Sequence, residues 1–150
     1  MMLFNFIIGL FFLVLLSVID LKTINKRNGY IPSVLTTFFL IFAVLVGDLN
    51  SIYLGVLASV IALLLTDMMF WDGLADLKTF IAASMLFGNM IEVLIFAVLF
   101  GILGTIFKAA FLKIVKKKDA IVPLIPIMAV AFLLEVLFIK NISSWILSLF

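Results

Sequence analysis

The sequence predicts an all-α polytopic membrane protein with six transmembrane helices and both chain ends outside. Hydrophobic residues make up 67% of the 150 residues and charged residues only 12%. A soluble domain of this length carries roughly a quarter charged residues and less than half apolar residues. Too few polar side chains are present to cover a water-exposed sphere. We therefore expect one integral membrane domain over residues 1–150.

Six apolar runs are the candidate spans, because a membrane-crossing helix needs about 20 mainly apolar residues. They are residues 2–19, 33–47, 51–70, 74–88, 90–107 and 121–139. The first run lacks a basic start and a small-residue cleavage site, so it is expected to stay as a span. The last ten residues, "NISSWILSLF", are too short to cross and are expected to lie in the interface, with Trp145 as an anchor.

Individual runs carry further signals. In the third run Gly55 and Ser59 are four residues apart, as are Ala58 and Ala62, and the fifth run contains Gly101 and Gly104. Small residues at such spacing allow close helix packing in lipid. The fourth run has only 12 residues from Leu77 to Gly88, about 18 Å of helix. The sixth begins near two prolines, which start or kink a helix.

The basic residues divide unequally between the two sides of the predicted topology. The connections after the first, third and fifth runs contain nine: Lys22, Lys26, Arg27, Lys78, Lys108, Lys113, Lys116, Lys117 and Lys118. The other connections contain only Lys140. The positive-inside rule places the first set in the cytoplasm. This distribution indicates membrane topology and contact with anionic lipid rather than nucleic-acid binding.

The sequence contains no cysteine and no histidine. A disulfide framework, a thiolate zinc site, a cysteine nucleophile and a catalytic histidine are therefore excluded. Any chemistry has to use Asp, Glu, Lys, Ser, Thr, Tyr or the backbone.

Five of the eight acidic residues map to the cytoplasmic side: Asp20, Asp67, Asp72, Asp76 and Asp119. Asp20 is expected to end the first span, and Asp76 to begin the short fourth span. Two carboxyl groups close together can share one proton, so that one activates water and the other polarises a carbonyl. Alternatively, each aspartate pairs with the lysine two residues later, Lys22 or Lys78.

The other three acidic residues map to the outer side. Asp48 is expected to be solvated in an outer loop. Glu92 and Glu135 are expected near the outer ends of their spans, where they can reach the interface.

Three segments resemble the type IV prepilin and preflagellin peptidases, the GxGD-type membrane aspartyl peptidases. "SVIDLK" is similar to the first aspartate motif of that family, and "GLADLK" to the second. "VPLIPIMAVAFLL" is similar to the prolines that precede the family's last helix. The order, the spacing and the six-span topology agree over nearly the whole chain.

The resemblance implies a membrane endopeptidase with Asp20 and Asp76 as catalytic residues at the cytoplasmic face of the cell membrane. It would cleave positively charged leader peptides from prepilin-like or prearchaellin-like precursors, with water as nucleophile and without a metal or cofactor. The membrane lipid and the precursor are the implied partners.

The chain departs from the family pattern at several places. Ala75 stands where the family has the second glycine after Gly73, and Ser33 replaces the usual Asn or Asp. The stretch from Asp20 to Pro32 is about five residues longer than usual. The cysteine-containing cytoplasmic domain of bacterial members is absent, which favours an archaeal-type enzyme without methyltransferase activity.

The remaining charged residues have less specific roles. Asp67, Asp72 and Asp119 could contact a basic leader, or could simply be solvated. Lys22 and Lys78 could favour the charged form of a neighbouring carboxyl, but snorkelling to lipid phosphates is preferred.

Two other functions stay open. One is a non-enzymatic membrane protein, either a small transporter or an assembly factor. A transporter should place ionisable groups or broken helices near the bilayer midplane, and in this sequence the charges cluster at span ends. The other is an inactive family member with a binding role.

Overall fold

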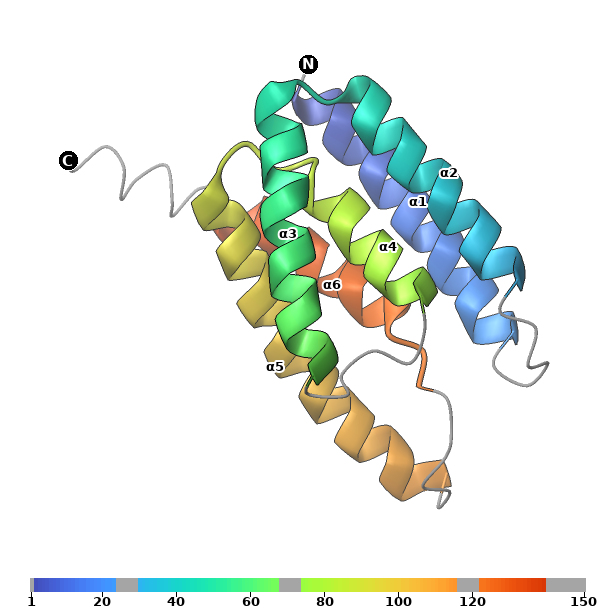
Figure 1. Cartoon of the computed structure of the whole chain (residues 1–150). Helices are drawn as coiled ribbons and strands as arrows, with labels where there is room; N and C mark the ends of the chain where they lie inside the picture. The colour runs from blue at the N-terminus through green and yellow to red at the C-terminus, as the bar shows by residue number, and fades with distance from the viewer. Residues whose placement is uncertain (1, 24–29, 68–73, 116–121, 140–150) are drawn as a thin grey trace.

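Six α-helices, one from each predicted apolar run, form the part of the chain that the computed structural model describes, residues 2–23, 30–67, 74–115 and 122–139 (Figure 1). They are α1 (Met2–Thr23), α2 (Tyr30–Val46), α3 (Leu49–Asp67), α4 (Leu74–Ser84), α5 (Met90–Val115) and α6 (Ile125–Leu134). A π-helical turn, η1 (Glu135–Ile139), continues α6. The described ranges contain no strand, so the prediction of an all-α fold is confirmed for them.

Two of the helices are long and apolar enough to cross a membrane. Their qualifying segments are Asn5–Lys22 in α1 and Met90–Ile114 in α5. Shorter apolar helical stretches cover Ser33–Val46, Leu49–Leu64 and Ile125–Phe138. The prediction of six spans therefore stays a prediction.

Helix α4 lies in the middle of the bundle (Figure 1). It packs mainly against α2 and α3, while α1 packs against α2 and α6, and α5 packs against α6. From residue 79 to residue 87 every side chain except Ile81 is buried. A helix that is enclosed on all sides needs small or apolar side chains all round, which Ala82 and Ala83 provide.

Phenylalanine rings connect α4 to its neighbours. Phe80 of α4 stacks on Phe96 of α5 with centroids 5.3 Å apart, and Phe87 lies 5.2 Å from both Phe96 and Phe132 of α6. Such pairs add about 0.5–1.5 kcal/mol each beyond their buried area. The core is therefore built around the central helix and the turn that follows it.

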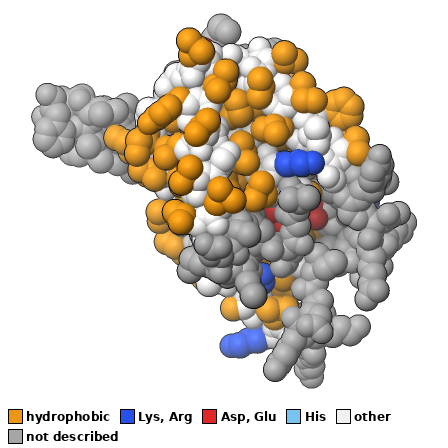
Figure 2. Space-filling view, viewed as in Figure 1, with side chains coloured by type: hydrophobic (Ala, Val, Ile, Leu, Met, Phe, Trp, Pro, Cys, Tyr) orange, Lys and Arg blue, Asp and Glu red, His pale blue; other side chains and the backbone are white. Residues whose placement is uncertain are grey.

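The outer surface is strongly apolar. Leu49 is 86% exposed, Ile114 80% and Leu45 78%, and Figure 2 shows apolar side chains over most of the described surface in that view. Apolar patches of this extent mark contact with a membrane or another protein.

Several helix boundaries differ from the predicted ones by three residues or more. Helix α1 continues three residues past Asp20 to Thr23, since neither Gly nor Pro interrupts it there; that the membrane span ends at Asp20 stays a prediction. Helix α5 runs to Val115, because lysines and alanines after residue 107 are good helix formers. Helix α6 begins only at Ile125, with a proline in its first turn, where a proline costs no hydrogen bond.

Glu92 caps a helix instead of reaching an interface. It is only 5% exposed. Its carboxylate accepts bonds from Gly88 N–H at 2.8 Å and Asn89 Nδ2 at 3.1 Å. The Asn89 side chain in turn accepts the Glu92 N–H at 3.0 Å. This reciprocal capping box satisfies the donors at the start of α5, so the interfacial prediction for Glu92 is wrong.

Glu135 is also buried rather than interfacial, with 1% of its surface exposed. It begins the π-helical turn η1, and both carboxylate oxygens are enclosed. A carboxyl group at such a position is costly unless neighbours compensate it. The prediction that Glu135 reaches the interface is therefore wrong.

Asp48 lies in the exposed connection before α3, as predicted, and it also caps that helix. Its Oδ1 accepts bonds from Ser51 N–H at 2.9 Å and from Ser51 Oγ at 3.0 Å. These two bonds hold the pKa of Asp48 below its ordinary value. The solvated loop residue is therefore also an N-cap.

The small residues of α3 face the core as predicted. Ala58 and Ala62 are fully buried. A Cβ at Gly55 would lie 2.8 Å from Met85 Cγ. Gly101 differs, because a Cβ there would meet no described atom within 4 Å. The prediction of close packing is confirmed for α3 and is wrong for Gly101.

These two glycines give a matched test of the packing. We expect Gly55→Leu to destabilise the protein by about 1–3 kcal/mol, since the core has no room for the side chain. Gly101→Leu should leave stability unchanged or raise it by up to about 1 kcal/mol, because leucine forms helix better than glycine. Thermal unfolding of the purified protein in detergent measures both. Equal losses in the two variants would contradict the packing of α3 against Met85.

Candidate functional site

Asp20 lies at the level where α2 begins. Helices α1 and α2 run side by side in opposite directions (Figure 1). Phe12 of α1 stacks on Phe39 of α2, with ring centroids 5.1 Å apart. Asp20 lies eight residues after Phe12 in α1, and the first turn of α2 lies eight residues before Phe39. Asp20 is therefore level with the first turn of α2.

The start of α4 lies at the same level. Lys78 Nζ donates hydrogen bonds to Thr37 Oγ1 at 3.1 Å and to Ser33 Oγ at 3.3 Å. Asp76 is in the first turn of α4, two residues before Lys78. Both predicted catalytic aspartates are therefore at one end of the bundle, which we call the Asp20 end.

The two carboxyl groups differ in exposure. Asp76 is buried, with 6% of its surface exposed, although it stands in the first turn of its helix. Asp20 is half-buried, and its Oδ2 is enclosed. Figure 2 shows only a small area of acidic atoms on the face in view. Carboxyl groups withdrawn from water in this way are typical of functional sites.

Neither lysine of the motifs pairs with its neighbouring aspartate. Lys22 is exposed, and Lys78 is half-buried with the hydroxyl groups of α2 as its partners. Residues two apart on a helix do not face each other, which explains why the predicted local pairs do not form. Snorkelling fits Lys22 but is wrong for Lys78.

The other predicted site residues are partly outside the described ranges. Ala75 is half-buried in the first turn of α4, and its carbonyl accepts a bond from Thr79 Oγ1 at 2.8 Å. This helical position does not require glycine. Asp67 is the last residue of α3 and thus belongs to the Asp20 end. Gly73, Asp72 and Asp119 lie outside the described residues.

Thr37 is a site residue that was not predicted from the sequence. No hydrogen-bond partner was predicted for Ser33 either. Both hydroxyl groups accept bonds from Lys78. Thr37 Oγ1 also donates to the Ser33 carbonyl at 2.9 Å. The available signal was a pair of hydroxyl residues four positions apart in an apolar run, which places both on one helix face.

Among the described residues, no three Asp or Glu side chains are grouped as a metal site would require. No protein-family model, curated protein or solved structure matches this chain. Its function must therefore be inferred from its own residues.

Removing the Thr37 hydroxyl should weaken the joint between α2 and α4. We expect Thr37→Val to lower stability by about 1.5–3 kcal/mol, the typical range for a hydrogen bond to a charged group. Thr105→Val is the matched control, because Thr105 Oγ1 is exposed and bonds only Gly101 O within its own helix. Thermal unfolding in detergent compares the two. A loss no larger than that of the control would contradict the role of Thr37.

Proposed function

We propose that this protein is a membrane aspartyl endopeptidase that removes positively charged leader peptides from prepilin-like or prearchaellin-like precursors. The observation that carries the proposal is the placement of Asp20 and Asp76 at one end of the bundle, with Asp76 almost fully enclosed. The resemblance of "SVIDLK" and "GLADLK" to the two aspartate motifs of the family supports the same pair.

The chemistry needs only the two carboxyl groups and water. One carboxylate takes a proton from water as its oxygen attacks the scissile carbonyl carbon, and the protonated partner donates a hydrogen bond to the carbonyl oxygen. The tetrahedral intermediate then collapses, the C–N bond breaks, and the leaving nitrogen receives a proton. Lys78 acts as a positioning residue, since its bonds to α2 hold the start of α4 in place.

Substrate binding follows from charge. A basic leader would approach the Asp20 end, where Asp67 ends α3 and where the proposal also places Asp72 and Asp119. Opposite charges at these positions would orient the leader by local contacts, because the end as a whole carries more basic than acidic residues. Gly73 and Ala75 belong to the second motif, with Ala75 small enough to keep the backbone near Asp76 accessible.

The proposal includes six membrane crossings in the cytoplasmic membrane, with the Asp20 end inside. The two membrane-length helices and the apolar exterior support it. The excess of basic residues in the connections at the Asp20 end supports the orientation. The hydrophobic part of the precursor would then lie in the bilayer beside its cleavage site.

The decisive experiment follows precursor trimming in cells that co-express the protein with a prepilin-like or prearchaellin-like precursor. We expect Asp20→Asn and Asp76→Asn each to lower the trimming rate at least about 100-fold, as loss of a general acid or base does. Glu92→Gln is the matched control, because glutamine also serves in a capping box. Trimming that persists in either aspartate variant refutes the pair.

A second candidate function, a small transporter, is favoured by Glu135. This residue is 1% exposed and starts a π-helical turn inside the bundle. Buried ionisable groups and π-turns recur at transport and functional sites.

Glu135→Gln separates the two candidates. If the protein is a peptidase, this variant should trim precursor at a rate within about threefold of wild type, as expected for a residue outside the general acid–base pair. If it is a transporter, proton-coupled flux into proteoliposomes should depend on Glu135 and not on Asp20. Flux that Glu135→Gln abolishes and Asp20→Asn preserves would favour the transporter.

A further inference from the structure

A polar pocket lies at the end of the bundle opposite the Asp20 end. It sits between the connection from α2 to α3 and the turn that follows α4, and its volume is about 160 Å³. This is several times the roughly 10–15 Å³ that a cavity needs to hold one water molecule. The space suits a small ligand or a headgroup rather than a folded peptide.

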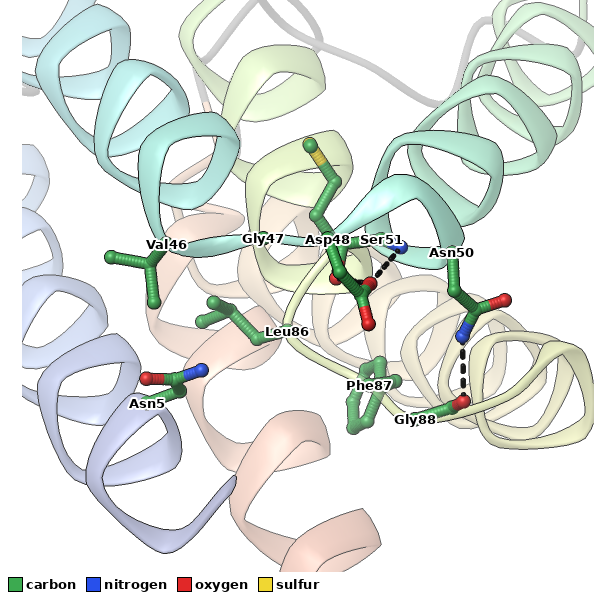
Figure 3. Close-up of a pocket in the computed structure, with 10 residues that line it drawn as sticks. Asn5, Val46, Gly47, Asp48, Asn50, Ser51, Leu86, Phe87 and Gly88 are labelled. Atoms are coloured by element: carbon green, nitrogen blue, oxygen red, sulfur yellow. Dashed lines mark hydrogen bonds between the residues drawn. The ribbon is translucent and has the colours of Figure 1, made fainter. Parts of the chain in front are cut away.

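Asp48 provides a fixed negative charge in this pocket. Ser51 donates both of its hydrogen bonds to Oδ1. Figure 3 shows the other carboxylate oxygen directed into the pocket. Because the same bonds lower the pKa of Asp48, the group is ionised at neutral pH.

Two asparagines flank this carboxylate. Asn50 donates its amide to Gly88 O at 2.9 Å, and its side-chain oxygen points away from Asp48 (Figure 3). Asn5 points toward the pocket from α1 (Figure 3). Helix α2 ends here at Val46, and the last carbonyls of a helix carry partial negative charge. Asp48 and these carbonyls therefore favour a cation with N–H groups.

No lysine or arginine of the described ranges lies at this end. The described cations Lys22, Lys78, Lys108 and Lys113 all belong to the half of the bundle near the Asp20 end. Among the described residues, a bound cation would thus meet no competing lysine or arginine.

The opposite wall of the pocket is apolar. It includes Phe87, Leu86 and Val46. A bare divalent ion needs six or more oxygen ligands, usually including several carboxylates, and no group of three Asp or Glu side chains exists among the described residues. An alkylammonium ion fits better, because its carbon chain contacts the apolar wall and its charge can also lie over an aromatic ring.

We propose that this pocket binds a primary alkylammonium ion, with the ammonium on Asp48 and the carbon chain against Phe87 and Leu86. The ligand is either a free small amine or the ethanolamine headgroup of a lipid. The exposed leucines beside the pocket, Leu45 and Leu49, suit the lipid source. The proposal does not depend on the peptidase activity.

The test uses the full-length protein in detergent with ethanolammonium chloride as the probe. We expect its thermal unfolding midpoint to rise and saturate, beyond the effect of sodium chloride at equal ionic strength. Asp48→Asn should need at least about tenfold more ethanolammonium. Asparagine is an equally good N-cap, so this variant keeps the fold and removes the charge. Glu92→Gln, which removes a carboxylate at the same end outside the pocket, should respond as wild type does.

The lipid arm compares nanodiscs of phosphatidylethanolamine with nanodiscs of phosphatidylcholine, whose trimethylated headgroup donates no N–H bond. Stabilisation by the ethanolamine lipid alone, lost in Asp48→Asn, assigns the headgroup as ligand and supports the proposal. Stabilisation by soluble ethanolammonium with equal behaviour in both lipids supports a free amine. An equal response in wild type and Asp48→Asn, an equal loss in Glu92→Gln, or choline acting as well as ethanolammonium overturns it.

Discussion

The early end of α4 is the constraint on which the rest of the structure depends. With 11 residues, the helix is about 16 Å long, and the turn that follows lies inside the bundle among buried side chains. Backbone groups withdrawn from water must find partners. Met85, Leu86 and Phe87 donate to carbonyls of α4 itself. Gly88 N–H is bonded by Glu92, and Gly88 O by Asn50. Glu92, which is buried, and Asn50, which is exposed, therefore hold the end of the turn in place.

This short central helix determines both ends of the molecule. At its start, Asp76 stands in a first turn that other helices enclose, and Lys78 joins that turn to α2 through Thr37 and Ser33. At its end, the chain turns back before it reaches the level of the α2–α3 connection. The space left there is the pocket that Asp48 faces. Because α4 is shorter than the helices around it, the carboxyl group of Asp76 is shielded from water at one end of the bundle, and the pocket beside Asp48 lies at the other end.

The positions of the six helices could be predicted from apolar runs alone, because each run is bounded by charges, glycine or proline. Their ends could not, since α1 passes Asp20 and α5 passes Lys108 without a residue that stops a helix. For the candidate site, the burial of Asp76 followed from the shortness of its run. The partners of Lys78 did not, because a contact between residues 41 positions apart depends on how the helices pack. Glu92 and Glu135 were placed wrongly for a similar reason. The local sequence around a carboxylate in an apolar helix does not distinguish a carboxylate that caps a buried turn from one that reaches the interface.

The geometry of α4 also separates the roles of the two charged residues in the short motif "ADLK". Successive helical residues are rotated by about 100°, so Asp76 and Lys78 project in directions about 160° apart. Lys78 donates its hydrogen bonds to α2, on the side of α4 opposite Asp76. The lysine therefore fixes the position of the first turn without neutralising the carboxyl group two residues before it. This separation bears on the proposed role of Asp76, because a direct ion pair with Lys78 would favour the charged form of the carboxyl group.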